Sequence, residues 1–183
     1  MELYKRKLLL KILRVFFKEL KYLSSNDILS VGKYKFLSQY FKSKIYGRSG
    51  LYALLPTDSK IVDFDKLIIR GDLFNSNLIK SFISSRLYIQ AINGVVIDSS
   101  VLIGPDVKII SANHNFKNFN KWDDSDPIII NKNVWIGANS VILPGVNLGL
   151  NCIVGAGSIV TKSFEDNSLI GGNPARLIRK KKA

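Results

Sequence analysis

The sequence has few of the residues that most often cross-link a chain or hold metals. Among 183 residues there are one cysteine and one histidine. A single cysteine excludes an intramolecular disulfide, and one cysteine with one histidine does not make a credible metal site. The sequence also lacks a run of about eighteen uncharged apolar residues and an evident signal cleavage site, so we expect a cytoplasmic protein. With 46% apolar residues, the chain can still bury one sizeable core.

The basic residues are concentrated at the two ends of the sequence. The whole chain has 27 Lys and Arg against 14 Asp and Glu, for a net charge of +13. Residues 1–23 carry seven basic and two acidic residues, and residues 174–183 carry five basic and no acidic ones. The 150 residues between them carry only 15 basic against 12 acidic residues. Because the body of the chain has no large basic face, we expect no nucleic-acid partner.

A six-residue repeat dominates the C-terminal third of the sequence. Aliphatic residues occupy every sixth position: Ile130, Ile136, Ile142, Leu148, Val154 and Val160. Small residues stand two positions before the last five of them: Val134, Ser140, Val146, Cys152 and Ser158. This period is typical of a parallel β-helix, in which each hexapeptide forms a short strand and a tight corner. The sequence therefore predicts an all-β solenoid of triangular coils, with the aliphatic residues pointing inward. In it, we expect Cys152 to be a packing residue and not a nucleophile.

The repeat continues upstream and slips once. It passes through Leu67, Leu73, Ile79, Ser85, Ala91, Ile97, Ile103 and Ile109. The 21 residues from Ile109 to Ile130 are three hexapeptides plus three residues, so the register changes between them. We therefore predict an inserted loop at residues 111–128.

The inserted loop contains the single histidine, His114. Loops that interrupt a rigid scaffold often carry binding and catalytic residues, and an imidazole suits a general base near neutral pH. We therefore predict that His114 is catalytic. The alternative is a turn residue that only makes hydrogen bonds between Asn113 and Asn115. Three carboxylates before Pro127 form either a solvated turn or part of an acceptor site; they are Asp123, Asp124 and Asp126.

Two regions follow from these patterns: an N-terminal amphipathic helix and cap region at residues 1–60, and a β-helix catalytic domain with a basic C-terminal tail at residues 61–183. In the first region, basic residues recur at steps of four and three: Lys7, Lys11, Arg14, Lys18 and Lys21. This stripe predicts a helix that caps the open end of the β-helix, or lies on an anionic membrane surface, or does both. The pattern of residues 24–60 fits a strand and a short helix equally well.

Three segments resemble the left-handed β-helix, hexapeptide-repeat acyltransferases, especially the sugar and polysaccharide O-acetyltransferase branch. The segments are IGPDVKIISANHNF, PIIINKNVWIGANSVILPGVNLGLNCIVGAGSIVTKSF and GGNPARLIRK. The resemblance runs from about Leu67 to Ala183. It implies left-handed coiling, acetyl-CoA as co-substrate, and a homotrimer that binds acetyl-CoA between neighbouring subunits.

The same resemblance implies roles for individual residues. His114 corresponds to the catalytic base, and the positions that match the CoA-binding residues are Trp135, Ala138, Ala156, Thr161, Lys162, Arg176 and Arg179. Asn113, Asn115 and Trp122 are candidates for contact with the acceptor. An acceptor-binding asparagine of galactoside and maltose acetyltransferases would align near Ser84, so those small sugars are poor candidates here.

The leading functional hypothesis is therefore an acetyl-CoA-dependent O-acetyltransferase that modifies a bacterial surface-glycan sugar by direct attack. Direct transfer is favoured because no nucleophile motif such as GxSxG is present. An N-acetyltransferase of a nucleotide-linked amino sugar would use a similar fold and base. A non-catalytic β-solenoid scaffold would explain the repeat but not the loop that carries His114.

Overall fold

The computed structural model describes residues 55–56, 58–72 and 76–180. The predicted helix at residues 1–23, most of residues 24–60, and Lys181 and Lys182 lie outside the described residues. Among the helices that are described, none has the length and apolarity needed to span a bilayer.

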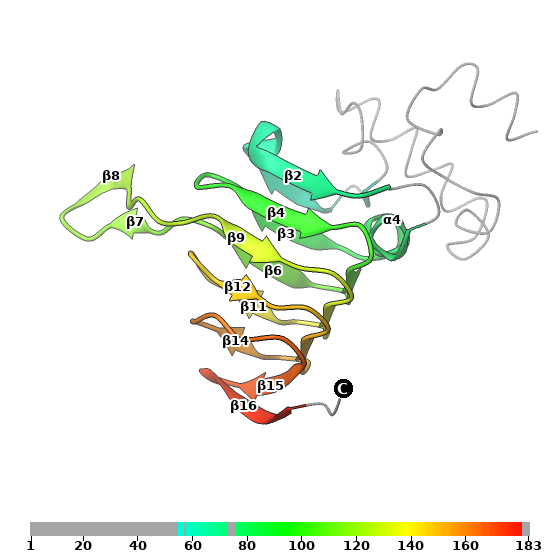
Figure 1. The fold of residues 1–183 in the computed structure, drawn as a ribbon. Helices are drawn as coiled ribbons and strands as arrows, with labels where there is room; N and C mark the ends of the chain where they lie inside the picture. Colours follow the sequence, from blue (N-terminus) through cyan, green and yellow to red (C-terminus); the bar gives the residue numbers. More distant parts are fainter. Residues whose placement is uncertain (1–54, 57, 73–75, 181–183) are drawn as a thin grey trace, which may run out of the picture.

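The described chain forms a three-sided parallel β-helix, which confirms the predicted fold class (Figure 1). Sheet A consists of β1 (Lys60–Val62), β3 (Leu87–Gln90), β6 (Val107–Ile110), β11 (Val141–Ile142) and β14 (Ile159–Val160). Sheet B consists of β2 (Leu67–Arg70), β4 (Val95–Asp98), β9 (Ile128–Ile130) and β12 (Asn147–Leu148). Sheet C consists of β5 (Leu102–Ile103), β10 (Trp135–Ile136), β13 (Ile153–Val154), β15 (Ser168–Gly172) and β16 (Ala175–Lys180). The chain visits the sheets in the order A, B, C, and Figure 1 shows that the coils wind in the left-handed sense.

The repeat predicted from the sequence forms the core. On sheet A, Ile109, Ile142 and Val160 lie in register on successive strands. Equivalent columns run through Ile97, Ile130 and Leu148 on sheet B, and through Ile103, Ile136, Val154 and Ile170 on sheet C. All of these side chains are at most 2% exposed. The small residues between them are buried as well, so both parts of the predicted pattern are confirmed.

The upstream part of the predicted repeat is wrong between β2 and β3. Residues Asn77–Ser84 form α4, whose N-cap is Ser76, with the Ser76 hydroxyl accepting from the Ile79 N–H at 3.1 Å. The helix buries Leu78, Ile79, Phe82 and Ile83 in the same core. It packs against β5 and takes the place of a sheet C strand in the first coil. Ile79 therefore follows a helical spacing, although it also falls on the six-residue period.

Asparagines define the corner between sheets B and C. Asn133, Asn151 and Asn167 have φ angles of 58°, 58° and 60°, a left-handed conformation that asparagine tolerates better than most residues. Their amides form a ladder: Asn133 Nδ2 donates to Asn151 Oδ1 at 3.2 Å, and Asn151 Nδ2 donates to Asn167 Oδ1 at 3.0 Å. This corner is therefore stabilised by both backbone conformation and side-chain hydrogen bonds.

Glycines permit close approach at the corner between sheets C and A. A Cβ atom added to Gly137 would lie 2.5 Å from the Ala156 backbone nitrogen, and one added to Gly104 would lie 2.7 Å from that of Ala138. A Cβ atom added to Gly155 would instead meet nothing closer than 3.4 Å, at the Ile170 carbonyl oxygen. Steric demand for glycine is thus much stronger at Gly137 than at Gly155.

This difference gives a test with a matched control. We expect Gly137→Ala to lower the melting temperature by about 3–10 °C, since overpacking against backbone atoms costs about 1–3 kcal/mol. Gly155→Ala, one coil further on, should change it by less than about 2 °C. Thermal melts followed by circular dichroism would measure both. Equal effects of the two substitutions would contradict the proposed close approach.

Candidate active site

The segment predicted as an inserted loop is a β-hairpin at the corner between sheets A and B. Strands β7 (His114–Asn115) and β8 (Asn118–Trp122) pair antiparallel, and Figure 1 shows them extending away from the body of the β-helix. The insertion ends at Pro127 and not at residue 128, because Ile128 is the first residue of β9 and is fully buried. The hairpin carries His114 outside the core, on a scaffold of stacked strands.

The N-terminal side of the hairpin is anchored to the preceding coil by Gln90. Its side-chain oxygen accepts a hydrogen bond from the Ala112 N–H at 3.0 Å, and its carbonyl accepts from the Ser111 N–H at 3.0 Å. Gln90 is 6% exposed, so its side-chain oxygen is satisfied inside the protein and not by solvent. The chain therefore leaves β6 in a defined direction.

The two sides of the hairpin base are joined by a hydrogen-bond network around Asn93 and Asp123. The Asn93 amide donates to the Asp123 carbonyl at 2.8 Å and to the Ser125 hydroxyl at 3.1 Å. The Asp123 N–H donates to the Asn113 carbonyl at 2.9 Å, and the Asp123 carboxylate accepts from Asn115 Nδ2 at 2.7 Å. Asp123 thus takes part in holding the hairpin, whereas sequence reasoning had considered only a solvated turn or acceptor binding for it.

Most of the predicted site side chains on the hairpin are exposed. His114 is exposed and stacks on Trp122, with the ring centroids 3.8 Å apart and the planes inclined by 29°. Asn113 is also exposed, whereas the Asn115 amide is used within the hairpin, where its oxygen accepts from the Lys117 and Asn118 N–H groups. The hairpin therefore presents His114, Asn113 and Trp122 together.

The predicted CoA-binding residues lie elsewhere on the β-helix. Trp135 is 49% exposed on sheet C, in register with Leu102 and Ile153. Ala138 and Ala156 occupy successive turns at the corner between sheets C and A, and the Ala138 carbonyl accepts from the Gly157 N–H at 2.8 Å. The Ala138 carbonyl thus already accepts one hydrogen bond within the protein.

The remaining predicted residues are near the C-terminal end of the β-helix. Thr161 and Lys162 follow β14 at the corner between sheets A and B, two coils below the hairpin, and Lys162 Nζ lies 5.7 Å from the centre of the Phe164 ring. Arg176 and Arg179 are exposed on β16. Within one chain, sheet A separates the corner that carries His114 from the corner that carries Ala138 and Ala156.

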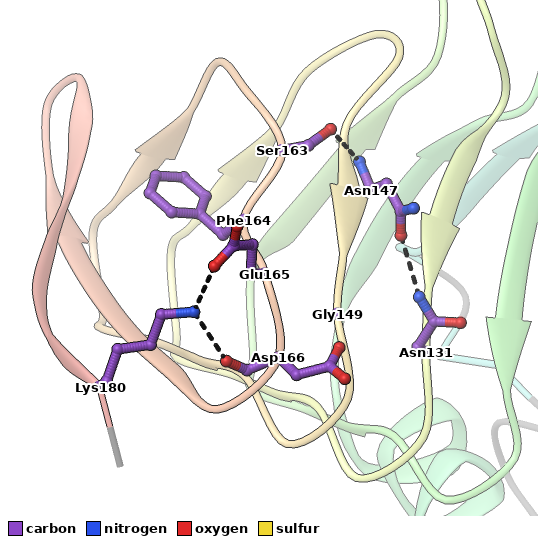
Figure 2. A pocket seen from close by; sticks show the side chains of 8 residues that line it. All are labelled: Asn131, Asn147, Gly149, Ser163, Phe164, Glu165, Asp166 and Lys180. Atoms are coloured by element: carbon purple, nitrogen blue, oxygen red, sulfur yellow. Dashed lines mark hydrogen bonds and ion pairs between the residues drawn. The ribbon is translucent and has the colours of Figure 1, made fainter.

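A separate groove lies near the corner between sheets B and C (Figure 2). Asn131 Nδ2 donates to Asn147 Oδ1 at 2.9 Å on one side of it. On the other, Lys180 Nζ donates to the Glu165 carboxylate at 2.8 Å, and this hydrogen bond lowers the pKa of Glu165 below its usual range. None of the predicted site residues lines this groove.

Among the described residues, the single imidazole is that of His114. In these ranges, no group of three or more His, Cys, Asp or Glu side chains could hold a metal ion. Cys152 is fully buried, and burial raises the pKa of its thiol, which donates to the Glu165 carbonyl at 3.1 Å. Because the thiolate is the nucleophilic form, Cys152 is unsuited to accept an acyl group.

We expect native Cys152 to react with a thiol reagent at least about a hundredfold more slowly than in concentrated guanidinium chloride, since reaction requires local opening of the β-helix. A colorimetric thiol assay at neutral pH measures both rates. Fast labelling of the folded protein would contradict the buried, protonated state.

Comparison with known proteins agrees with this architecture. The family described as the hexapeptide repeat of succinyl-transferase matches residues 127–162. A galactoside O-acetyltransferase of Escherichia coli is 44% identical over 90 residues, covering 46% of this chain and 43% of that protein. A putative acetyltransferase of Saccharomyces cerevisiae is 36% identical over 121 residues (64% and 58%), and a putative lipopolysaccharide biosynthesis O-acetyltransferase of E. coli is 32% identical over 123 residues (61% and 62%).

A solved structure is also similar to part of this chain. A galactoside acetyltransferase in complex with coenzyme A matches with a TM-score of 0.49 and 42% identity, covering 51% of this chain and 48% of that one. The chain spans about 43% to 62% of the length of these curated relatives. The comparisons agree with the family resemblance seen in the sequence: the matched part of this chain is similar to hexapeptide-repeat acyltransferases.

Proposed function

We propose that the protein is an acetyl-CoA-dependent O-acetyltransferase that modifies a hydroxyl of a bacterial surface-glycan sugar, in a capsule, O-antigen or exopolysaccharide. The observation that carries the proposal is the exposed His114 on a hairpin whose base is fixed to a rigid scaffold. The relatives named as galactoside and lipopolysaccharide O-acetyltransferases support transfer to a sugar hydroxyl.

In the proposed reaction, the acceptor hydroxyl attacks the thioester directly. The His114 imidazole takes the hydroxyl proton while the acceptor oxygen bonds to the acetyl carbonyl carbon. The carbon–sulfur bond then breaks, and CoA leaves as a thiolate that receives a proton. A sugar hydroxyl is a poor nucleophile without such a base, which contributes about 10² to 10⁴ in rate. The burial of Cys152 supports direct transfer without an acyl-enzyme.

We propose that acetyl-CoA binds between subunits of a homotrimer. Trp135 and the backbone at Ala138 and Ala156 would contact the pantetheine part of acetyl-CoA. Polar and basic residues near the C-terminal end would contact its nucleotide part: Thr161, Lys162, Arg176 and Arg179. The separation of His114 from Ala138 and Ala156 on one chain supports a site that two subunits complete.

For the acceptor, we propose contacts with Asn113, Asn115 and Trp122. Of these, Asn113 has the advantage of an exposed side chain beside His114, whereas the Asn115 amide already serves the hairpin. The release of CoA across a panel of amino sugars, neutral sugars and glycans tests the acceptor class. Transfer only to a nucleotide-linked amino sugar would replace O-acetylation with N-acetylation, and no transfer to any acceptor would favour a scaffold.

We place the protein in the cytoplasm, where acetyl-CoA is available, with peripheral contact at the inner membrane surface through residues 1–23. The basic stripe of that segment supports the contact, since each cation near an anionic surface contributes about 1 kcal/mol. Co-sedimentation of the full chain with anionic vesicles at low and high salt tests it. No binding at low salt would remove the membrane contact from the proposal.

We expect His114→Ala to lower the transfer rate at least about a hundredfold, because the acceptor then loses its general base. Binding of acetyl-CoA and the melting temperature should stay near wild type, since the imidazole is exposed and outside the core. Lys117→Ala, on the same hairpin, is the matched control and should keep its activity. Wild-type turnover by His114→Ala would contradict the assignment.

We also expect acetyl-CoA to bind more tightly than its dephospho derivative, and Arg179→Ala to remove part of that preference. A guanidinium makes strong paired hydrogen bonds with phosphate, so the loss should be confined to the ligand that carries the 3′-phosphate. Isothermal titration with both ligands measures the difference. Lys66→Ala, which lies at the opposite end of the β-helix, is the control. Equal affinity of the wild-type protein for both ligands would exclude this role of Arg179.

A further inference from the structure

We infer that Trp122 is a positioning residue for His114: its indole ring fixes the imidazole and stabilises the positive charge that the imidazole gains when it accepts the acceptor's proton. This inference rests on the proposed role of His114 as general base. The observation behind it is the stacked pair across the hairpin, in which His114 and Trp122 are register partners with ring centroids 3.8 Å apart.

The stack is the contact that can orient the imidazole. A catalytic histidine is often held by a carboxylate or carbonyl that accepts a hydrogen bond from one ring nitrogen. Among the described residues, no hydrogen bond to either ring nitrogen of His114 is present. Stacking on Trp122 therefore restricts the ring while leaving both nitrogens available for proton transfer.

The positions of both rings are set by the hairpin base. Trp122 directly precedes Asp123, whose N–H donates to the carbonyl of Asn113, the residue before His114. Asn93 in turn holds the Asp123 carbonyl at 2.8 Å. Each ring is therefore one residue away from a hydrogen bond that joins the two sides of the hairpin, so the stacked geometry is supported by the backbone beneath it. Such a support is what a general base needs, because small displacements of a reacting group reduce the rate strongly.

The stack also favours the charged form of the base. The face of an indole ring attracts a cation, and this attraction is absent for a neutral imidazole. In general-base catalysis the imidazole becomes positively charged as the proton moves, so the interaction is stronger in the transition state than before it. The other ionisable groups of the inserted segment are Lys117, Lys121, Asp123, Asp124 and Asp126, and the Asp123 carboxylate is bonded to Asn115.

Fluorescence tests the stack without any acceptor. The chain has two tryptophans, so a Trp135→Phe background leaves Trp122 as the only indole. A protonated imidazole in ring contact quenches indole emission, so we expect emission to fall as the pH is lowered from 8 to 5, and the change to disappear when His114→Ala is added. A pH dependence that is the same with and without His114 would overturn the inference. This outcome does not depend on whether the protein is an acetyltransferase.

Kinetics test the catalytic part. We expect Trp122→Ala to lower kcat about three- to thirtyfold with the KM for acetyl-CoA unchanged. Trp122→Phe keeps a stacking ring and should recover most of the rate. Phe119→Ala is the control, since Phe119 is 71% exposed on the same hairpin and has no ring contact with His114.

The fluorescence and kinetic experiments together distinguish the ways in which this inference could be wrong. A rise in the acceptor KM with kcat unchanged would mean that Trp122 is only a platform for the sugar, which overturns the inference. If fluorescence shows the stack but His114→Ala is as active as wild type, the proposed general base is wrong, and with it the catalytic part of this inference.

Discussion

Backbone hydrogen bonds between successive coils hold this β-helix together, and they form only because the corners allow the coils to approach closely. The Gly104 N–H donates to the Ile136 carbonyl at 2.8 Å, and the Gly137 N–H donates to the Val154 carbonyl at 2.8 Å. Both glycines lie where a Cβ atom would meet the backbone of the next coil. The same close spacing of the coils stacks the inward aliphatic side chains into continuous columns. Side-chain packing in the core and hydrogen bonds between strands therefore both depend on how closely successive coils approach.

This repetitive scaffold explains how the hairpin can be both protruding and well positioned. An insertion at a corner interrupts the chain but leaves the strands on either side in register, because β6 and β9 pair with strands of other coils. The polar backbone at the exit is satisfied by Gln90 and Asn93 of the preceding coil. The hairpin is thus attached to a part of the fold that does not need it for stability, which leaves its side chains open to functional selection.

Sequence periodicity predicted the core well at positions that fit the six-residue period and no helical spacing. Ile136, Ile142 and their equivalents fit the six-residue period and no helical spacing, and they are inward-facing in the structure. Ile79 fits both patterns, because a helix also brings Leu78, Phe82 and Ile83 to its buried face, and the helical alternative was missed. The hydrogen bonds of Gln90, Asn93 and Asp123 join residues up to 32 positions apart and follow no local motif, so no short-range signal could identify them. The change of register that is visible in the sequence falls where the structure has the hairpin that carries His114.

The last strand of the structure reverses direction. β16 pairs antiparallel with β15 and ends sheet C. A stack of parallel strands would otherwise offer an unpaired edge on which a second molecule could continue the sheet, as happens when solenoids or amyloid strands add end to end. The reversed strand instead presents the exposed Arg176 and Arg179, whose charges oppose the addition of an identical edge. At the edge of sheet C, the reversed strand therefore takes the place that a parallel strand of a second molecule would need, which disfavours end-to-end addition there.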